Sequence, residues 1–266
     1  MVGYTGILSV AHAAFYGVGA YVAALMALRL DSPFLLNLIL AMIAAAIIGA
    51  IVGIPSLRIK DDYFVIATFA FQIITFSILN NLVNFTGGPL GLPGISQPVI
   101  FGYTISTHVQ FLIISFLLAL FTYYVCSGLI KSSFGRVLKA IREDEVFVMS
   151  AGKNVASFKV QVFIIGAVLA SISGVIYATY ITYIDPTSFT VMESIFIIAI
   201  VIIGGAGSLK GPIIGTIVLV ALPEILRFVG LPNSIAANIR QILYGGLLVI
   251  LMLWRPQGFV GEYKLK

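Results

Sequence analysis

Few residues in this sequence have types and spacings that could support catalysis. His12 and His108 are the two histidines, and Cys126 is the single cysteine. There is no HExxH pattern, no cysteine pair and no cluster of carboxylates, so the sequence predicts neither a metal centre nor a catalytic residue. A membrane-embedded enzyme would have to rely on His12 or on Asp185 with Glu193. We expect the chain not to be an enzyme.

Four polar side chains lie in or at the end of apolar runs and could line a path for a solute. They are His12, Gln72, Asn80 and Asn81. A polar residue inside a membrane span is costly and is by default a candidate for function. Gln72 and Asn80 are eight residues apart and share one face of a helix. The alternative is that these groups form hydrogen bonds between helices, worth about 0.6 kcal/mol each, which is the favoured interpretation for His12.

Three acids could form the proton relay of a secondary transporter. Asp185, Glu193 and Glu224 fall at or near the ends of predicted spans, where a solvated carboxylate needs no such role. A transporter or channel that works without ATPase subunits is therefore an alternative that has no intramembrane acid chain to support it.

The glycine-rich run from Gly204 to Gly211 is superficially similar to a phosphate-binding loop. A Walker A loop needs Gly-Lys-Ser/Thr after four spacer residues, so that backbone amides and the lysine converge on phosphates. Here Lys210 follows Leu209 and precedes Gly211. We therefore expect this chain to bind no ATP and no other cofactor.

The segment Phe134–Lys159 concentrates charge in an otherwise apolar chain, with eight of the 25 Lys, Arg, Asp and Glu residues. Its apolar residues recur at i, i+3 and i+4 spacing, which predicts one short amphipathic helix. These residues are Phe134, Val137, Leu138, Ile141, Val148 and Met149. Gly152 provides a C-terminal stop. Because both charge signs are mixed on the other faces, a groove on a partner protein is favoured over an anionic lipid surface.

The elements that position these residues are membrane spans. The 266 residues are 60% hydrophobic and 9% charged, with a mean hydropathy of +1.12, whereas soluble domains carry about 25% charged residues. Many apolar runs approach the ~20 residues needed to cross a bilayer. The composition predicts an all-α, polytopic transmembrane helix bundle in the cell membrane. The net charge of +5 arises in short loops between spans and does not indicate nucleic acid binding.

Eight spans are predicted within a single transmembrane domain over residues 1–266, with a cytoplasmic loop over residues 130–159. The spans are Ile7–Leu28, Phe34–Ile54, Phe64–Val83, Val109–Leu129, Val160–Tyr183, Ser194–Ile203, Pro212–Val229 and Ile239–Trp254. The sixth is short, and a broken or half-length helix is an alternative there.

The Lys and Arg residues predict the orientation. With Phe134–Lys159 in the cytoplasm, twelve basic residues fall on the cytoplasmic side and three on the other, namely Arg29, Arg227 and Arg240. This asymmetry follows the positive-inside rule, and it places both termini in the cytoplasm.

The longest non-cytoplasmic loop, Asn84–Thr107, contains no Lys, Arg, Asp or Glu. Its run Thr86, Gly87, Gly88, Pro89 carries turn signals that predict an ordered, compact loop. The loop is either a cap over the bundle or a docking or gating surface for something arriving from outside, and the sequence favours neither.

Five motifs follow one another along the chain. They are Gly3–Tyr21, Leu57–Phe64, Thr86–Leu92, Gly135–Glu145 and Gly204–Pro212. They resemble the motifs of the branched-chain amino acid ABC-transporter permeases, the Liv type, and most of all those of its LivM-like members. Such permeases usually carry a further span before the first motif, which Met1 almost abuts here. We expect either a shortened version or a natural start upstream.

The resemblance implies an import permease for branched-chain or other hydrophobic amino acids that works by alternating access. The implied partners are a second related permease, two cytoplasmic ATPase subunits that hydrolyse the ATP, an extracytoplasmic substrate-binding protein and the lipid bilayer. Relatives that import urea or short amides share much of the same signature, so these solutes are the alternative substrates.

The same resemblance implies that the helix Gly135–Gly152 docks in a groove of an ATPase subunit. The implied coupling residues are Gly135, Arg136, Lys139, Ala140, Ile141, Arg142, Glu143, Glu145 and Gly152. The segment departs from the wider family's E-A-A-x-x-x-G pattern, because Glu145 precedes Gly152 by seven residues instead of six.

Overall fold

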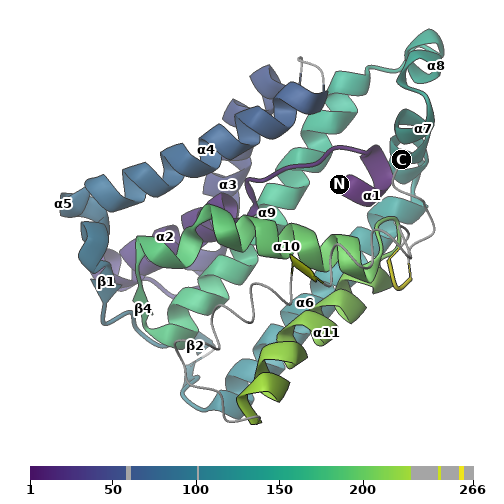
Figure 1. The fold of residues 1–266 in the computed structure, drawn as a ribbon. Helices are drawn as coiled ribbons and strands as arrows, with labels where there is room; N and C mark the ends of the chain where they lie inside the picture. Colours follow the sequence, from purple (N-terminus) through teal and green to yellow (C-terminus); the bar gives the residue numbers. More distant parts are fainter. Residues whose placement is uncertain (58–60, 101, 229–244, 247–257, 261–266) are drawn as a thin grey trace. The chain divides into compact units, whose positions relative to one another are not determined.

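The computed structural model describes residues 1–57, 61–100, 102–228, 245–246 and 258–260 (Figure 1). The chain divides into two compact units: Met1 with residues 7–194, and residues 2–6 with residues 195–266. The predicted span Ile239–Trp254 lies outside the described residues, apart from residues 245–246.

The larger unit is built from five helices that are long and apolar enough to cross a membrane. They are α2 (His12–Leu30), α3 (Phe34–Ser56), α4 (Asp61–Asn81), α6 (His108–Lys131) and α9 (Val155–Ile181). Each coincides with one of the first five predicted spans, which confirms a polytopic helical membrane bundle.

Two of these helices begin five residues away from the start that the hydropathy predicts, which are the largest differences among the five. The first starts at His12 and not at Ile7, because the backbone of residues 6–11 is irregular. The fifth starts at Val155 and not at Val160, since Asn154 caps it by accepting a hydrogen bond from the Ser157 amide (3.1 Å).

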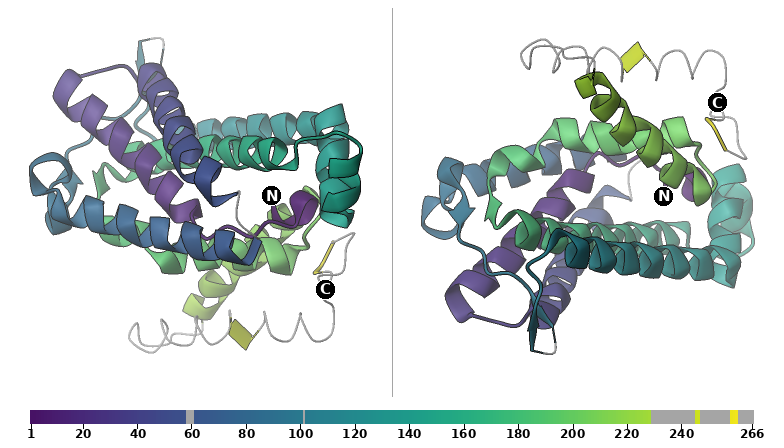
Figure 2. Two further views of the ribbon diagram at one scale, coloured as in Figure 1. Left: turned by 90° about the horizontal axis from the view of Figure 1, so that it is seen from above. Right: turned by 90° about the horizontal axis from the view of Figure 1, so that it is seen from below.

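The helices α2, α3 and α9 pack side by side (Figure 2). The spacing of small residues along the fifth predicted span predicts close packing there, and the structure confirms it. A Cβ added at Gly19 would lie 2.2 Å from the Ser171 carbonyl oxygen, and one at Gly174 would lie 2.0 Å from that of Tyr16. The backbones of α2 and α9 therefore approach more closely than any side chain would allow.

One end of the larger unit is closed by short elements. They are α5 (Val83–Thr86), η1 (Gly88–Leu90), β1 (Leu92–Pro93), β2 (Val99–Ile100), β3 (Tyr103–Thr104), β4 (Tyr183–Ile184) and η2 (Pro186–Phe189). Strand β1 pairs antiparallel with β4, with Leu92 opposite Ile184, and β2 pairs with β3. The predicted order of the loop Asn84–Thr107 is thereby confirmed in the part that the structure describes.

At the opposite end of α6 lie two short helices, α7 (Ser133–Glu143) and α8 (Glu145–Ser150). Figure 2 shows them lying across the ends of α6 and α9. The prediction of one helix over this segment is wrong. Asp144 is extended (φ −155°, ψ 104°), and its carboxylate accepts a hydrogen bond from the Phe147 amide at 3.0 Å. It is thus the N-cap of a second helix, a position that Asp strongly favours.

The smaller unit contains α1 (Val2–Thr5), most of α10 (Val191–Gly204) and α11 (Lys210–Phe228). Its glycine-rich run brings backbones together: a Cβ at Gly204 would lie 1.9 Å from the Gly211 carbonyl oxygen. The Ser208 hydroxyl accepts a hydrogen bond from the Gly211 amide at 2.9 Å, which fixes the turn between the two helices. Here the glycines serve tight helix packing.

Candidate docking segment

The turn that leads into α7 depends on Gly135. Ser132 is the N-cap, and its hydroxyl accepts a hydrogen bond from the Gly135 amide at 3.4 Å. A Cβ at Gly135 would lie 2.2 Å from the Ile130 carbonyl oxygen. This residue is buried and sets the angle between α6 and α7, so its role is to position the segment.

The inner face of α7 and α8 forms a small apolar core with the start of α9. Leu138, Ile141, Val148 and Val155 are each at most 6% exposed. Beside them the rings of Phe134 and Phe158 stack at 5.5 Å between centroids. The amphipathic pattern therefore identified the buried face correctly, with one exception. Met149 is 52% exposed, because the break at Asp144 turns α8 relative to α7.

The chain leaves α8 through a tight turn at Gly152. Its φ of +77° is a left-handed conformation that favours glycine. The Gly152 amide donates to the Met149 carbonyl (3.0 Å), and the Lys153 amide donates to that of Val148 (3.2 Å). These bonds satisfy carbonyl groups at the helix end, which confirms the predicted stop.

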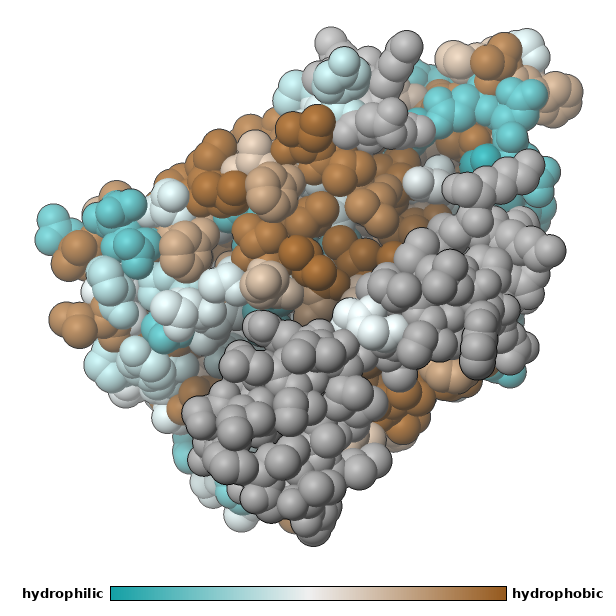
Figure 3. Space-filling model, in the orientation of Figure 1, coloured by the Kyte–Doolittle hydropathy of each residue, from teal (hydrophilic) through white to brown (hydrophobic). Residues whose placement is uncertain are grey.

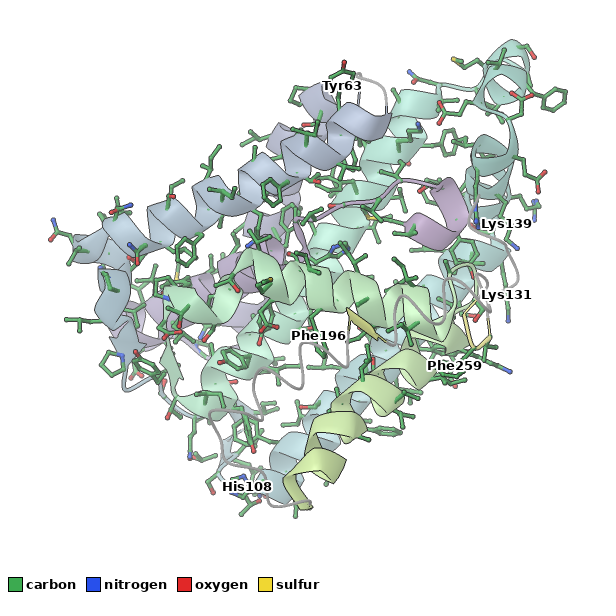
Figure 4. All side chains as sticks on the ribbon, viewed as in Figure 1. Tyr63, His108, Lys131, Lys139, Phe196 and Phe259 are labelled. Carbon is green, nitrogen blue, oxygen red and sulfur yellow. The ribbon has the colours of Figure 1, made fainter. Side chains whose placement is uncertain are left out.

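The outer face of the segment carries both charge and exposed apolar side chains. Arg136 and Glu143 are exposed, whereas Lys139, Ala140 and Arg142 are half-buried. Figure 4 labels Lys139 near the Lys131 end of α6, with His108 at the other end. In Figure 3 hydrophilic residues gather over α7 and α8, with apolar ones among them.

Two further apolar residues lie on this face, and the periodicity of the sequence does not predict them. Val146 is 70% exposed and Phe147 is 68% exposed. Their signal in the sequence is that they break the i, i+3, i+4 pattern while lying directly after three acidic residues. With Met149 they form what we call the α8 apolar face. Exposed apolar groups at a polar end of a membrane protein are typical of a protein contact.

Glu145 is engaged within the chain. Its carboxylate forms an ion pair with the ammonium group of Lys159, whose side chain is 6% exposed, while that of Glu145 is 36% exposed. Nothing in the spacing of the segment predicted this pair, since Lys159 belongs to α9.

Gln72, one of the predicted path residues, is completely buried, and both its amide oxygen and its amide nitrogen form hydrogen bonds. Its Oε1 accepts from the Ala14 amide at 2.6 Å and from the Ser194 hydroxyl at 3.2 Å. Its Nε2 donates to the Phe189 carbonyl at 2.8 Å. The Ser194 hydroxyl also accepts from the Ala13 amide at 2.9 Å. Gln72 therefore joins α4, the start of α2 and η2, as the interhelical interpretation expects.

The other path residues lie apart from this cluster or at its edge. His12 opens α2, and its Nδ1 is buried without a hydrogen-bond partner among the described residues. Asn80 is half-buried near the end of α4. Asn81 is exposed, and its amide donates to the Ser77 carbonyl at 2.9 Å. Their role in a solute path remains a prediction.

The Thr86–Pro89 turn at the other end is built from backbone and hydroxyl bonds. Thr86 is 4% exposed; its hydroxyl donates to the Leu79 carbonyl (2.7 Å) and accepts from the Gly88 amide (3.2 Å). Gly87 and Gly88 both have positive φ. Pro89 is exposed. The first three residues thus shape the turn, and only the proline reaches outward.

A cavity of about 1050 Å³ opens between α6 and α9. Its lining includes the aromatic rings of Tyr16, Tyr177 and Tyr180, and His108 stands at one end, its Nδ1 3.3 Å from the Tyr180 hydroxyl. The four predicted path residues are not among the residues that line it.

The part of the chain that the structure describes contains five membrane-length helices and a charged helical segment beyond them, which define a multi-pass protein of the cell membrane. The family model described as "Branched-chain amino acid transport system / permease component" matches residues 1–252, and the chain belongs to this family.

The chain is similar to permeases named LivM and to permeases named LivH. The high-affinity branched-chain amino acid transport permease LivM of Escherichia coli is 33% identical over 98% of this chain and 65% of its own length. A probable LivM of Methanocaldococcus jannaschii is 29% identical over 85% of this chain and 68% of its own. The permease LivH of Escherichia coli is 28% identical over 98% of this chain and 87% of its own length. The chain thus spans about two thirds of the LivM relatives, and no solved structure matches it.

Proposed function

We propose that this chain is a permease subunit of an ATP-driven importer of branched-chain or other hydrophobic amino acids. The observation that carries the proposal is the α7–α8 segment, which projects a charged and apolar surface from the end of a membrane bundle in a member of this family. Such a surface suits a soluble partner that delivers energy, since a helix laid in a groove is a common way to join two proteins.

The proposed assembly contains four other components. A second related permease would complete the membrane part, two cytoplasmic ATPase subunits would bind α7 and α8, and an extracytoplasmic protein would deliver the substrate. ATP would be bound and hydrolysed by the ATPase subunits. Their closure would shift the equilibrium between outward- and inward-facing states, which requires that they bind one state more tightly than the other.

The substrate class rests on the names of the relatives, which are branched-chain amino acid permeases. The chain would be purified with its partner subunits, reconstituted in vesicles and supplied with labelled leucine. We expect uptake that needs ATP, the ATPase subunits and the binding protein. Uptake of leucine by this chain alone along a gradient would contradict the proposal, and uptake restricted to urea or short amides would replace its substrate.

A further inference from the structure

The ion pair between Glu145 and Lys159 joins the segment that faces the partner to a membrane helix. Glu145 is the first residue of α8, and Lys159 lies in the second turn of α9. The pair therefore bridges the turn at residues 151–154 that separates the two helices.

The environment of the pair makes it persistent. The Lys159 side chain is 6% exposed, and a buried cation must be paired because it has lost its hydration. Glu145 is more accessible, at 36%, but its position is fixed by the Asp144 cap beside it. An exposed pair would be weak and screened by salt, whereas one whose cation is buried resists separation.

An apolar contact and a glycine turn also connect α8 to α9. Val148 packs against Val155 in the small apolar core, and the covalent link passes through Gly152 at φ +77°. Apolar contacts have no preferred direction, so they do not by themselves prevent α8 from rotating about that turn. The ion pair supplies a second, directional attachment and so removes this freedom.

We propose that the Glu145–Lys159 pair is the rigid link by which a displacement of α8 moves α9. This inference rests on the proposed function and assigns Glu145 a positioning role inside the chain, in place of a contact with the ATPase. Because α9 packs along α2 and α3, a force applied at α8 would reach the centre of the bundle.

The test compares uptake with ATP hydrolysis in the complete reconstituted transporter. The variants are Glu145→Gln, Lys159→Met and the exchanged pair Glu145→Lys with Lys159→Glu. We expect both single variants to retain the ATPase subunits and ATP hydrolysis while substrate moved per ATP falls at least tenfold. The exchanged pair restores the ratio to within about threefold. Lys153→Met, which removes an exposed cation between α8 and α9, is the matched control and leaves the ratio unchanged.

Two results would overturn the inference. One is a ratio in Glu145→Gln equal to that of the wild type; the other is loss of the ATPase subunits from Glu145→Gln without rescue by the exchanged pair, which would make Glu145 a direct contact. Because Lys159→Met can prevent folding, the Glu145→Gln variant, whose site is partly exposed, decides the matter. Failure of the proposed function is distinguishable, since the wild-type protein would then show no ATP-dependent uptake.

Discussion

Each end of the larger unit carries one of the sequence motifs, but the motif residues have different roles at the two ends. At the loop end, Thr86 is 4% exposed, and its bonds close a turn. In the α7–α8 segment the motif residues Leu138 and Ile141 are buried, whereas Val146 and Phe147, which follow the motif directly, are about two-thirds exposed. A motif alone therefore does not tell the role of a residue. Burial separates the residues that shape the local structure from the residues that face outward.

This contrast predicts opposite outcomes for substitutions at the two ends. At the docking segment a change on the α8 apolar face should impair assembly and leave folding intact. At the loop end a change in a turn residue should impair folding.

The largest effect is expected for Phe147→Asp. A charge placed in an apolar contact loses the burial of a Phe side chain, about 1.5–3 kcal/mol, and adds the cost of desolvating a carboxylate. We expect ATP-dependent uptake to fall at least a hundredfold because the ATPase subunits no longer co-purify. The thermal unfolding midpoint of the permease should not change, since Phe147 is 68% exposed. Leu90→Asp, at an exposed position of the loop end (83%), is the matched control and should keep the ATPase subunits bound.

The next effect concerns a glycine of the loop end. Gly91 has φ +68°, and a Cβ there would lie 2.1 Å from the Ile184 carbonyl oxygen. Gly91→Ala must therefore displace β4 and adopt a strained backbone, which we expect to destabilise the protein by about 2–4 kcal/mol. Gly94→Ala separates the two causes, because φ is +78° but no described atom lies within 4 Å of the added Cβ. It should cost only about 1 kcal/mol. Equal unfolding free energies for the two variants would show that the close approach at Gly91 is unimportant.

A smaller loss is expected for Thr86→Val, which keeps the shape of the side chain and removes its hydroxyl. The Leu79 carbonyl and the Gly88 amide would lose a partner, at a cost of about 1–3 kcal/mol. Thr104→Val, at an exposed position in β3, should change the unfolding free energy by less than about 0.5 kcal/mol. Unfolding in denaturant, followed by far-ultraviolet circular dichroism, would measure both.

The smallest effect depends on pH and involves Asp185 at the loop end. Burial alone would raise the pKa of its carboxyl, but hydrogen bonds from the Ser188 hydroxyl and amide and the Thr187 hydroxyl lower this pKa overall. A lowered pKa in the folded state adds stability that is complete above the ordinary value of about 3.9 and is lost as the pH falls through the folded value. Asp185→Asn should therefore lower the unfolding midpoint slightly at pH 7, and this difference should shrink as the pH falls below the ordinary pKa of the carboxyl. A difference that widened on acidification would contradict this assignment.

Much of the architecture could be predicted from the sequence, because a long apolar segment crosses a bilayer as a helix that satisfies its own backbone hydrogen bonds. The start of the first span could not, since the amides of Ala13 and Ala14 find their partners on Ser194 and Gln72, which the chain brings together only on folding. The break at Asp144 could have been found: an Asp followed by an acidic first turn is a signal for a new helix.

The α7–α8 segment could likewise be predicted only in part. Periodicity correctly placed Leu138 and Ile141 on the buried face, because it reports which side of a helix is apolar. The family resemblance implied that Gly135 and Ile141 contact the partner, although both are buried within the chain. It also could not reveal that Glu145 pairs with Lys159, since that contact joins two helices whose packing is a tertiary property.

The proposed binding of the ATPase subunits to the α8 apolar face can be tested directly by crosslinking. A photo-crosslinking amino acid would be introduced at position 147 and, in a second protein, at the exposed loop position 90. After illumination of the assembled transporter, we expect an adduct with an ATPase subunit from position 147 and none from position 90. An ATPase adduct from position 90, or its absence from position 147 in a transporter that still takes up substrate, would contradict it.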